Sequence, residues 1–295
     1  MTMRPPVFEI SRPAELTSPL IFSSPHSGSY YPPEFLEASR LTPLALRSSE
    51  DCYVDRLFSA APSFGAFLIK ANYPRAFLDL NREAYELDPA MFKGGLPPYA
   101  NSSSPRVAAG LGTIPRLVAE AAPIYKNQLA IEEGLERINS FYFPFHLALQ
   151  ELISKVKAQF GYCLLIDCHS MPKLLTKGSS TTGGFLSSKR QSVDFVVGDN
   201  FGTACDGSLS TFVSQFFRDH GYSVTHNQPY AGGYITRRYG RPRQLTHAIQ
   251  LEIGRNLYMN SRTLEPNDGF QLLQRLLTDF VRAITSFEFL HQAAE

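Results

Sequence analysis

A short apolar run leads directly into residues that can carry chemistry. Leu164-Leu165-Ile166 is followed by Asp167-Cys168-His169-Ser170, and the run predicts a buried strand that ends at these polar residues. Alternate side chains of a strand share a face, so Asp167 and His169 would point the same way. This pair suits a metal-binding imidazole oriented by a carboxylate, or the general-base histidine of a hydrolase. A strand that simply ends in polar loop residues is the alternative interpretation.

A second histidine occupies a similar position earlier in the chain. Residues 20–24 predict another buried strand, and Pro25-His26-Ser27-Gly28 follows at its carboxyl end. Open α/β sheets bind ligands outside the carboxyl ends of neighbouring strands, which would bring His26 and His169 together. A loop histidine without a ligand is the simpler possibility.

Nearby acids could complete a site of this kind. The apolar spacing of residues 47–61 predicts an amphipathic helix, with Glu50, Asp51 and Asp55 in its first turns. Acids there also favour the helix dipole without any further function. A carboxylate at this helix start could equally join two histidines in a zinc site.

One carboxylate interrupts an apolar strand near the end of the chain. Residues 247–255 predict a strand in which Glu252 stands among Ile249, Leu251 and Ile253. An ionised carboxylate is costly to bury unless a cation or a water-filled cleft receives it. Glu252 is therefore the general-base candidate, and a buried ion pair with Arg255 is the alternative.

Two arginine-containing segments could bind an anionic ligand. One follows a predicted strand at 65–73, and the other is a glycine- and aromatic-rich loop at 227–242. Guanidinium groups bind carboxylates through two parallel hydrogen bonds. An ion pair with Asp79 and a solvated basic loop are the alternatives for the two segments. The candidate substrate-binding residues are Arg75, Asn81, Arg82, Tyr234, Arg237 and Arg241.

Composition limits the class of partner. The 295 residues carry a formal net charge of +1 and 19% charged residues, which favours neither nucleic acid nor a membrane surface. The four cysteines show no Cys-x-x-Cys spacing, so reduced thiols are expected, and the N-terminus lacks the apolar segment of a signal peptide. We expect a soluble, cytoplasmic protein that binds a small molecule.

The remaining helices are predicted from apolar periodicity. Their expected ranges are 117–140, 144–160, 208–220 and 265–290. His146 lies in the first turn of the second range, where a polar residue at the surface or at a site rim is expected.

Taken in order, these motifs resemble the N-formylglutamate amidohydrolase family over residues 21–260. The likeness rests on the histidine motif at 25–28, Glu50-Asp51, Arg75 through Asp79-Leu80-Asn81-Arg82, Asp167-Cys168-His169-Ser170, Gly232-Gly233, and residues 239–252. Each motif is weak alone, but the ordered set is specific.

The resemblance implies a fold, a reaction and a set of roles. The fold would be a single three-layer α/β/α domain spanning 1–295 with a mixed central sheet, related to zinc carboxypeptidases and aspartoacylase. One zinc ion, or another divalent metal, would be held by His26, His169 and Asp51, with Glu50 and Asp55 as alternative acids. Glu252 would be the general base, and Asp167 would orient His169.

The reaction implied is metal-dependent hydrolysis of N-formyl-L-glutamate, or a related N-acyl amino acid, with zinc-bound water as the nucleophile. The arginines would then bind an anionic substrate with two carboxylates. A serine or cysteine hydrolase is disfavoured because the sequence lacks a Gly-x-Ser-x-Gly motif and Cys168 should face away from His169. A non-catalytic binding protein for acidic amino acids is the alternative from another class.

Overall fold

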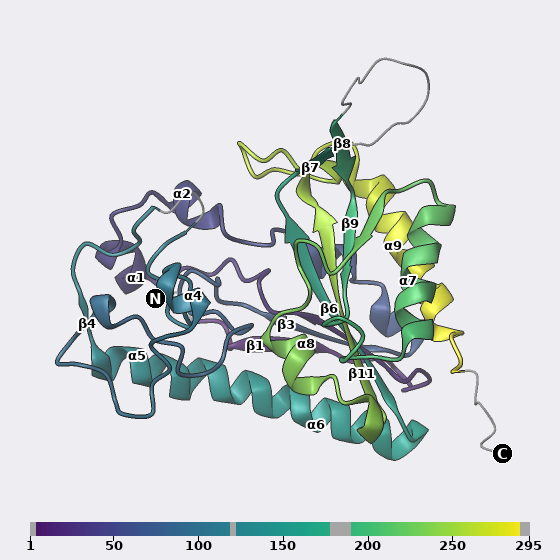
Figure 1. The fold of residues 1–295 in the computed structure, drawn as a ribbon, viewed down its shortest axis with the longest axis horizontal. Helices are drawn as coiled ribbons and strands as arrows, with labels where there is room; N and C mark the ends of the chain where they lie inside the picture. Colours follow the sequence, from purple (N-terminus) through teal and green to yellow (C-terminus); the bar gives the residue numbers. More distant parts are fainter. Residues whose placement is uncertain (1–3, 119–121, 178–189, 290–295) are drawn as a thin grey trace.

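The chain folds around a mixed sheet of seven strands (Figure 1). The computed structural model describes residues 4–118, 122–177 and 190–289. The strand order is β1-β3-β2-β6-β11-β9-β10, with β3, β2, β6 and β11 mutually parallel. Strand β1 is antiparallel to β3, and β9 is antiparallel to β11 but parallel to β10. The strands of this sheet are β1 (Phe8–Ser11), β2 (Leu20–Ser24), β3 (Phe67–Ala71), β6 (Cys163–Met171), β9 (Phe195–Gly198), β10 (Val224–His226) and β11 (Thr246–Gly254).

Two small ribbons and nine described α-helices surround the central sheet. Two small ribbons pair β4 (Phe92–Lys93) with β5 (Leu129–Ala130), and β7 (Leu174–Lys177) with β8 (Arg190–Val193). The helices are α1 (Pro33–Ala38), α2 (Pro43–Arg47), α3 (Val54–Leu57), α4 (Pro105–Ala108), α5 (Ile131–Arg137), α6 (Phe143–Phe160), α7 (Gly207–Asp219), α8 (Tyr234–Tyr239) and α9 (Phe270–Thr285). A short π-helix, Ile138–Tyr142, joins α5 to α6.

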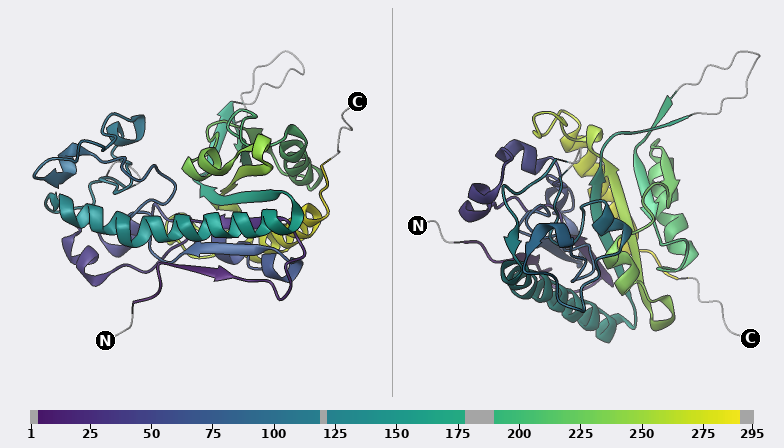
Figure 2. Two further views of the ribbon diagram at one scale, coloured as in Figure 1. Left: turned by 90° about the horizontal axis from the view of Figure 1, so that it is seen from below. Right: turned by 60° about the vertical axis from the view of Figure 1, so that its left-hand side comes forward.

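Helices cover both faces of the sheet and confirm the predicted three-layer α/β/α architecture (Figure 2). On one face, the long helix α6 and the short helix α8 contribute Leu149, Leu152 and Ile235 to one apolar cluster. On the other, helices α3, α7 and α9 contribute to a second cluster that includes Val213 and Phe280. Burial of these apolar faces is the main force that holds the layers together.

The two central strands, β6 and β11, are buried along their whole length. They run parallel in a register that places Gln250 beside Asp167 and Glu252 beside His169. The apolar neighbours Cys168 and Leu251 point into the opposite cluster. Strand alternation therefore directs four polar side chains to one face, at the carboxyl end of both strands.

The predicted helix at 47–61 is wrong. Helix α2 ends at Arg47, and the only α-helix that follows within the range is the single turn α3. Tyr53 adopts a left-handed backbone with φ of 66°, which interrupts a right-handed helix. The intervening turn instead carries Glu50 and Asp51 into the interior, where both are buried.

Helix α5 begins fourteen residues later than the predicted start at Leu117, because residues 110–118 turn back on themselves through backbone hydrogen bonds. His146 is also not a surface residue. It is buried on α6, where Nε2 lies 2.9 Å from the carbonyl oxygen of Leu80 and Nδ1 lies 2.8 Å from the hydroxyl of Tyr239. The histidine thus ties α6 to α8 and is structural.

All four cysteines are free and buried, as the sequence predicts. Within the described parts of the chain, no helix combines the length and apolar character that a bilayer crossing requires.

Candidate active site

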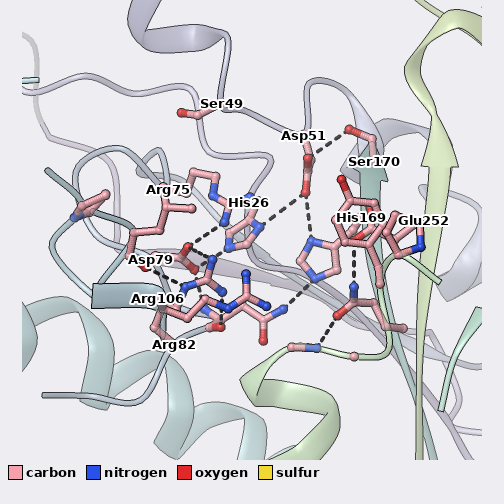
Figure 3. A pocket seen from close by; sticks show the side chains of 18 of the residues that line it. His26, Ser49, Asp51, Arg75, Asp79, Arg82, Arg106, His169, Ser170 and Glu252 are labelled. Carbon is pink, nitrogen blue, oxygen red and sulfur yellow. Dashed lines mark hydrogen bonds and ion pairs between the residues drawn. The ribbon is translucent and has the colours of Figure 1, made fainter. Parts of the chain in front are cut away.

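Three side chains from separate segments converge at the carboxyl edge of the sheet (Figure 3). His26 follows β2, His169 lies near the end of β6, and Asp51 comes from the turn between α2 and α3. Their ligand atoms all lie within 4.8 Å of one another, and all three residues are buried. Asp51 Oδ2 is 3.4 Å from Nδ1 of His26 and 2.9 Å from Nδ1 of His169.

The local fold selects Asp51 from the three acids considered above. Its backbone N–H donates to the carbonyl oxygen of His26 at 3.0 Å, which draws the turn against the histidine loop. Glu50 is held elsewhere, because the hydroxyl of Tyr31 and the guanidinium of Arg47 both donate to its carboxylate. Asp55 lies 3.4 Å from the ammonium group of Lys70. Only Asp51 therefore faces the two histidines.

Each histidine has a carboxylate close to its other ring nitrogen, and Nε2 of His169 also lies 2.9 Å from Asn81 Nδ2. Asp79 Oδ1 lies 2.7 Å from Nε2 of His26, and Asp167 Oδ2 lies 3.0 Å from Nε2 of His169. The Nδ1 atoms consequently point toward Asp51. This is the carboxylate–histidine arrangement that fixes the ring orientation of metal ligands.

Two further observations indicate that these three residues could bind a divalent cation. Nδ1 of His26 is buried and has no hydrogen-bond partner among the described residues, an expensive state for a polar atom that a bound cation would relieve. Asp51 uses its other oxygen, Oδ1, to accept hydrogen bonds from Ser170 and Arg255 at 3.0 and 3.1 Å. Its Oδ2 atom is thereby presented to both imidazoles.

The carboxylates and imidazoles of this cluster stabilise one another's charged forms. Burial disfavours the ionised form of Asp51, but the hydrogen bond from His169 and the nearby imidazole of His26 outweigh it and hold the pKa of this carboxyl well below its ordinary value. Burial likewise disfavours a charged His169, but the carboxylates of Asp167 and Asp51 raise its pKa well above the usual range. A cation at this place would replace the imidazole proton as the partner of Asp51.

Asn81 links the histidine cluster to helix α8. Its Nδ2 atom donates to Asp167 Oδ2 at 3.0 Å, and its Oδ1 atom accepts the backbone N–H of Ile235 at 2.7 Å. The first turn of a helix has backbone N–H groups without intrahelical partners, and Asn81 satisfies one of them from outside the helix. Gly233 is required at this contact, because a Cβ there would lie 2.3 Å from Asn81 Nδ2.

Glu252 lies on the strand beside His169 and lines the same cavity. The Nε2 group of Gln250 donates to Glu252 Oε1 at 2.7 Å, and Gln250 itself accepts the backbone N–H of Gly233 at 2.5 Å. Burial raises the pKa of Glu252 to about 7, even though the charges of His169 and Arg75 oppose that shift. A carboxyl with a pKa near neutrality can both accept and donate a proton.

The cavity has a volume of about 510 Å³ and is lined by most of the predicted site residues. Arg75, Asn81, Arg82 and Arg237 contribute to the lining together with the histidine cluster and Glu252. Asp167 lies directly beneath His169 and is fully buried.

Two predicted substrate-binding residues lie elsewhere. Tyr234 is not part of the lining and packs against the rings of Tyr142 and His146. Arg241 is exposed and donates to the carbonyl oxygens of Arg237 and Gly240, at the end of helix α8. The short helix turns both side chains away from the cavity, an arrangement that a loop prediction for 227–242 could not anticipate.

Three residues of the cavity lining were not predicted from the sequence to belong to the site. Arg255, considered only as a partner of Glu252, instead donates to Asp51 and Ser170. Asp79, considered only as a partner of arginine, also orients His26. Arg106 enters the cavity from helix α4, within a Pro- and Ser-rich segment in which no local motif distinguishes this arginine.

A thiol nucleophile is not supported by this geometry. Cys168 lies in the apolar cluster on the far face of β6, and burial raises the pKa of its thiol well above the ordinary value. The thiolate is the reactive form of cysteine, so such a residue is inert.

Comparisons with known proteins agree on one family. A family model described as N-formylglutamate amidohydrolase matches residues 18–259. An N-formylglutamate deformylase of Pseudomonas aeruginosa is 30% identical over 251 residues, which cover 83% of each chain. An N-formylglutamate deformylase of Pseudomonas putida is 29% identical over 248 residues, or 82% of each chain. The crystal structure of an N-formylglutamate amidohydrolase from Ralstonia eutropha aligns with a TM-score of 0.83 at 35% identity, covering 94% of this chain and 96% of the other.

Proposed function

The chain belongs to the N-formylglutamate amidohydrolase family, and we propose that it hydrolyses N-formyl-L-glutamate to formate and L-glutamate with a zinc ion as cofactor. The observation that carries the proposal is the buried group of His26, Asp51 and His169 beside Glu252, in a cavity rich in arginine.

Zinc is proposed because the donor set and its spacing suit this ion. Two imidazole nitrogens and one carboxylate oxygen form a common catalytic zinc site that keeps a position open for water or substrate. Asp51 Oδ2 lies 3.4 and 2.9 Å from the two Nδ1 atoms, so one ion could contact all three residues.

His26, Asp51 and His169 would hold the ion, and Asp79 and Asp167 would keep the two imidazoles in the required orientation. When bound, zinc supplies Lewis-acid polarisation of the formyl oxygen and acidifies water at neutral pH. Ser170 and Arg255 donate to Asp51 Oδ1, which leaves Oδ2 of Asp51 facing the two imidazoles.

Glu252 would move the protons of the reaction. Its Oε1 atom is held by Gln250, and Oε2 has no hydrogen bond to any described residue. In the proposed reaction, this carboxylate takes a proton from the attacking water and delivers it to the amide nitrogen, so that the C–N bond breaks with a neutral amine leaving. General acid–base catalysis of this kind contributes about 10²- to 10⁴-fold in rate.

The arginines would supply substrate affinity. N-formyl-L-glutamate carries two carboxylates, and guanidinium groups are the preferred partners of carboxylates in partly buried sites. Arg75 lies 2.7 Å from Asp79 and lines the cavity wall next to the histidine cluster, which suits contact with the carboxylate nearest the amide.

Formate release from N-formyl-L-glutamate tests the proposal directly. Purified protein is assayed with and without a chelator, and after zinc is restored, while the metal content of the same sample is measured. Chelator-sensitive turnover with about one zinc per chain supports the proposal. A zinc-loaded protein that leaves N-formyl-L-glutamate intact but cleaves N-acetyl-L-glutamate would change the substrate and keep the mechanism. A protein that binds glutamate but stays inert after zinc is restored would be a binding protein.

A further inference from the structure

The cavity carries more positive than negative charge. Among its described lining residues are five arginines and only three carboxylates, those of Asp51, Asp79 and Glu252. Guanidinium groups that line a cavity and lack acidic partners are available to bind an anionic ligand. A ligand with negative charge would relieve this imbalance, and the distribution of the arginines indicates where that charge would lie.

Three of the five arginines already have acidic partners. Arg75 and Arg82 share Asp79, at 2.7 and 3.5 Å, and Arg255 lies 3.1 Å from Asp51 Oδ1. Arg106 and Arg237 form no ion pair with any carboxylate in the described parts of the chain. Asp79 is shared by two guanidinium groups, and the charge of Glu86 also acts on Arg82. Arg106 is therefore the guanidinium at this end of the cavity that has no acidic partner among the described residues.

Arg75, Arg82 and Arg106 lie on the same side of the proposed metal site (Figure 3). Arg75 is close enough to Asp51 and Glu252 for their charges to stabilise its guanidinium. The positive charges of Arg75 and Arg106 both act on Arg82, and together with burial they lower its pKa to about 10 despite Asp79 and Glu86. Figure 3 shows Arg106 reaching toward Arg82 on the side away from Glu252.

The two carboxylates of the substrate lie at different distances from its amide group. In N-formyl-L-glutamate the α-carboxylate sits on the carbon that bears the amide nitrogen, whereas two methylene groups separate the side-chain carboxylate from that carbon. With the formyl group at the histidine cluster, the α-carboxylate would be within reach of an arginine beside that cluster, which we take to be Arg75. The side-chain carboxylate then extends to the distal arginines.

We propose that Arg106, together with Arg82, binds the side-chain carboxylate of the substrate and makes the enzyme selective for acidic N-formyl amino acids. The inference rests on the proposed function. Arg106 has an exposed side chain on the one-turn helix α4, which lets the guanidinium meet a ligand without breaking an existing ion pair. Arg237, on helix α8, is the rival candidate for the same carboxylate.

A comparison of two nearly isosteric substrates tests the inference. N-formyl-L-glutamine keeps the shape of N-formyl-L-glutamate but lacks the side-chain charge. The value of kcat/KM is measured on both substrates for the wild type, Arg106→Met, Arg237→Met and Arg238→Met. Arg238 is the matched control, because it is an exposed arginine on helix α8 outside the cavity lining.

Arg106→Met should lower kcat/KM for N-formyl-L-glutamate by about 10- to 100-fold, the effect of one charge-assisted contact, and change the glutamine analogue by less than about 3-fold. Arg106→Lys should recover part of the preference. Arg238→Met should keep the wild-type preference.

Two results separate this inference from the proposed function. A wild type that releases no formate from N-formyl-L-glutamate overturns the proposed function. An active wild type whose glutamate preference survives in Arg106→Met, or is lost to the same extent in Arg237→Met, overturns only the role of Arg106. Melting curves of the variants show that each is folded.

Discussion

Asp79 stands 53 positions after His26 in the sequence, yet its Oδ1 atom lies 2.7 Å from Nε2 of His26. The same carboxylate pairs with Arg75 at 2.7 Å through its other oxygen and accepts the backbone N–H of Asn81 at 2.9 Å. One buried acid therefore connects a proposed metal ligand with an arginine of the cavity wall. A substitution of Asp79 should affect both His26 and Arg75.

Replacing Asp79 by asparagine should weaken metal binding by roughly 10- to 100-fold, because His26 loses the charged partner that orients its ring. Competition with a calibrated chelator measures the zinc affinity of the variant. Asp55→Asn is the control, since this acid pairs with Lys70 and is not among the residues lining the cavity. Equal zinc affinities of Asp79→Asn and the wild type would contradict the orienting role.

Glu252→Gln should lower kcat by about 10²-fold or more while zinc stays bound, because glutamine keeps the shape of the side chain but cannot accept the proton. The hydrogen bond from Gln250 can be retained by the amide oxygen of the new side chain. Metal analysis and single-turnover formate release separate binding from chemistry. A variant that loses its zinc would instead indicate that Glu252 helps to hold the ion.

Gly233→Ala should destabilise the fold by about 1–3 kcal/mol, because the new methyl group would overlap Asn81 in a packed region. Displacement of Asn81 should also reduce zinc affinity, since Asn81 donates to Asp167 beneath His169. Urea unfolding and chelator competition measure the two effects. Gly207→Ala is the matched control, because nothing lies within 4 Å of a Cβ at that position. Two variants of equal stability would argue against a tight contact at Gly233.

Stability should decrease in weak acid because of His146. Burial lowers the pKa of this histidine to about 4, whereas it regains an ordinary pKa of about 6.5 on unfolding. Between these values the unfolded chain binds the proton and the folded chain does not, so the free energy of unfolding falls as the pH is lowered. The loss attributable to His146 should approach about 3 kcal/mol near pH 4.

His146→Gln isolates this contribution. Glutamine can still donate to the carbonyl oxygen of Leu80 but does not titrate. Urea unfolding at pH 7 and pH 4.5 should show a smaller acid-induced loss in the variant than in the wild type. Identical losses would mean that other groups account for the acid sensitivity.

The sequence alone predicted which side chains of the two central strands share a face. Strand alternation has a period of two residues and depends only on local backbone geometry, so Asp167 with His169, and Gln250 with Glu252, share a face wherever the strands are placed. The apolar runs around them likewise predicted a buried sheet between helices, and the structure confirms it. The ordered motifs identified the family from the same local information.

Only the tertiary structure decided which other residues reach the site. The helical period of residues 47–61 was overridden because burial of Glu50 and Asp51 in polar contacts required a turn. Arg106 entered the cavity, and Tyr234 and Arg241 were turned away from it, through the path of segments whose sequence contains no periodic signal. Contacts such as that of Asp79 with His26 join residues far apart in the chain, and no local preference of the backbone encodes them.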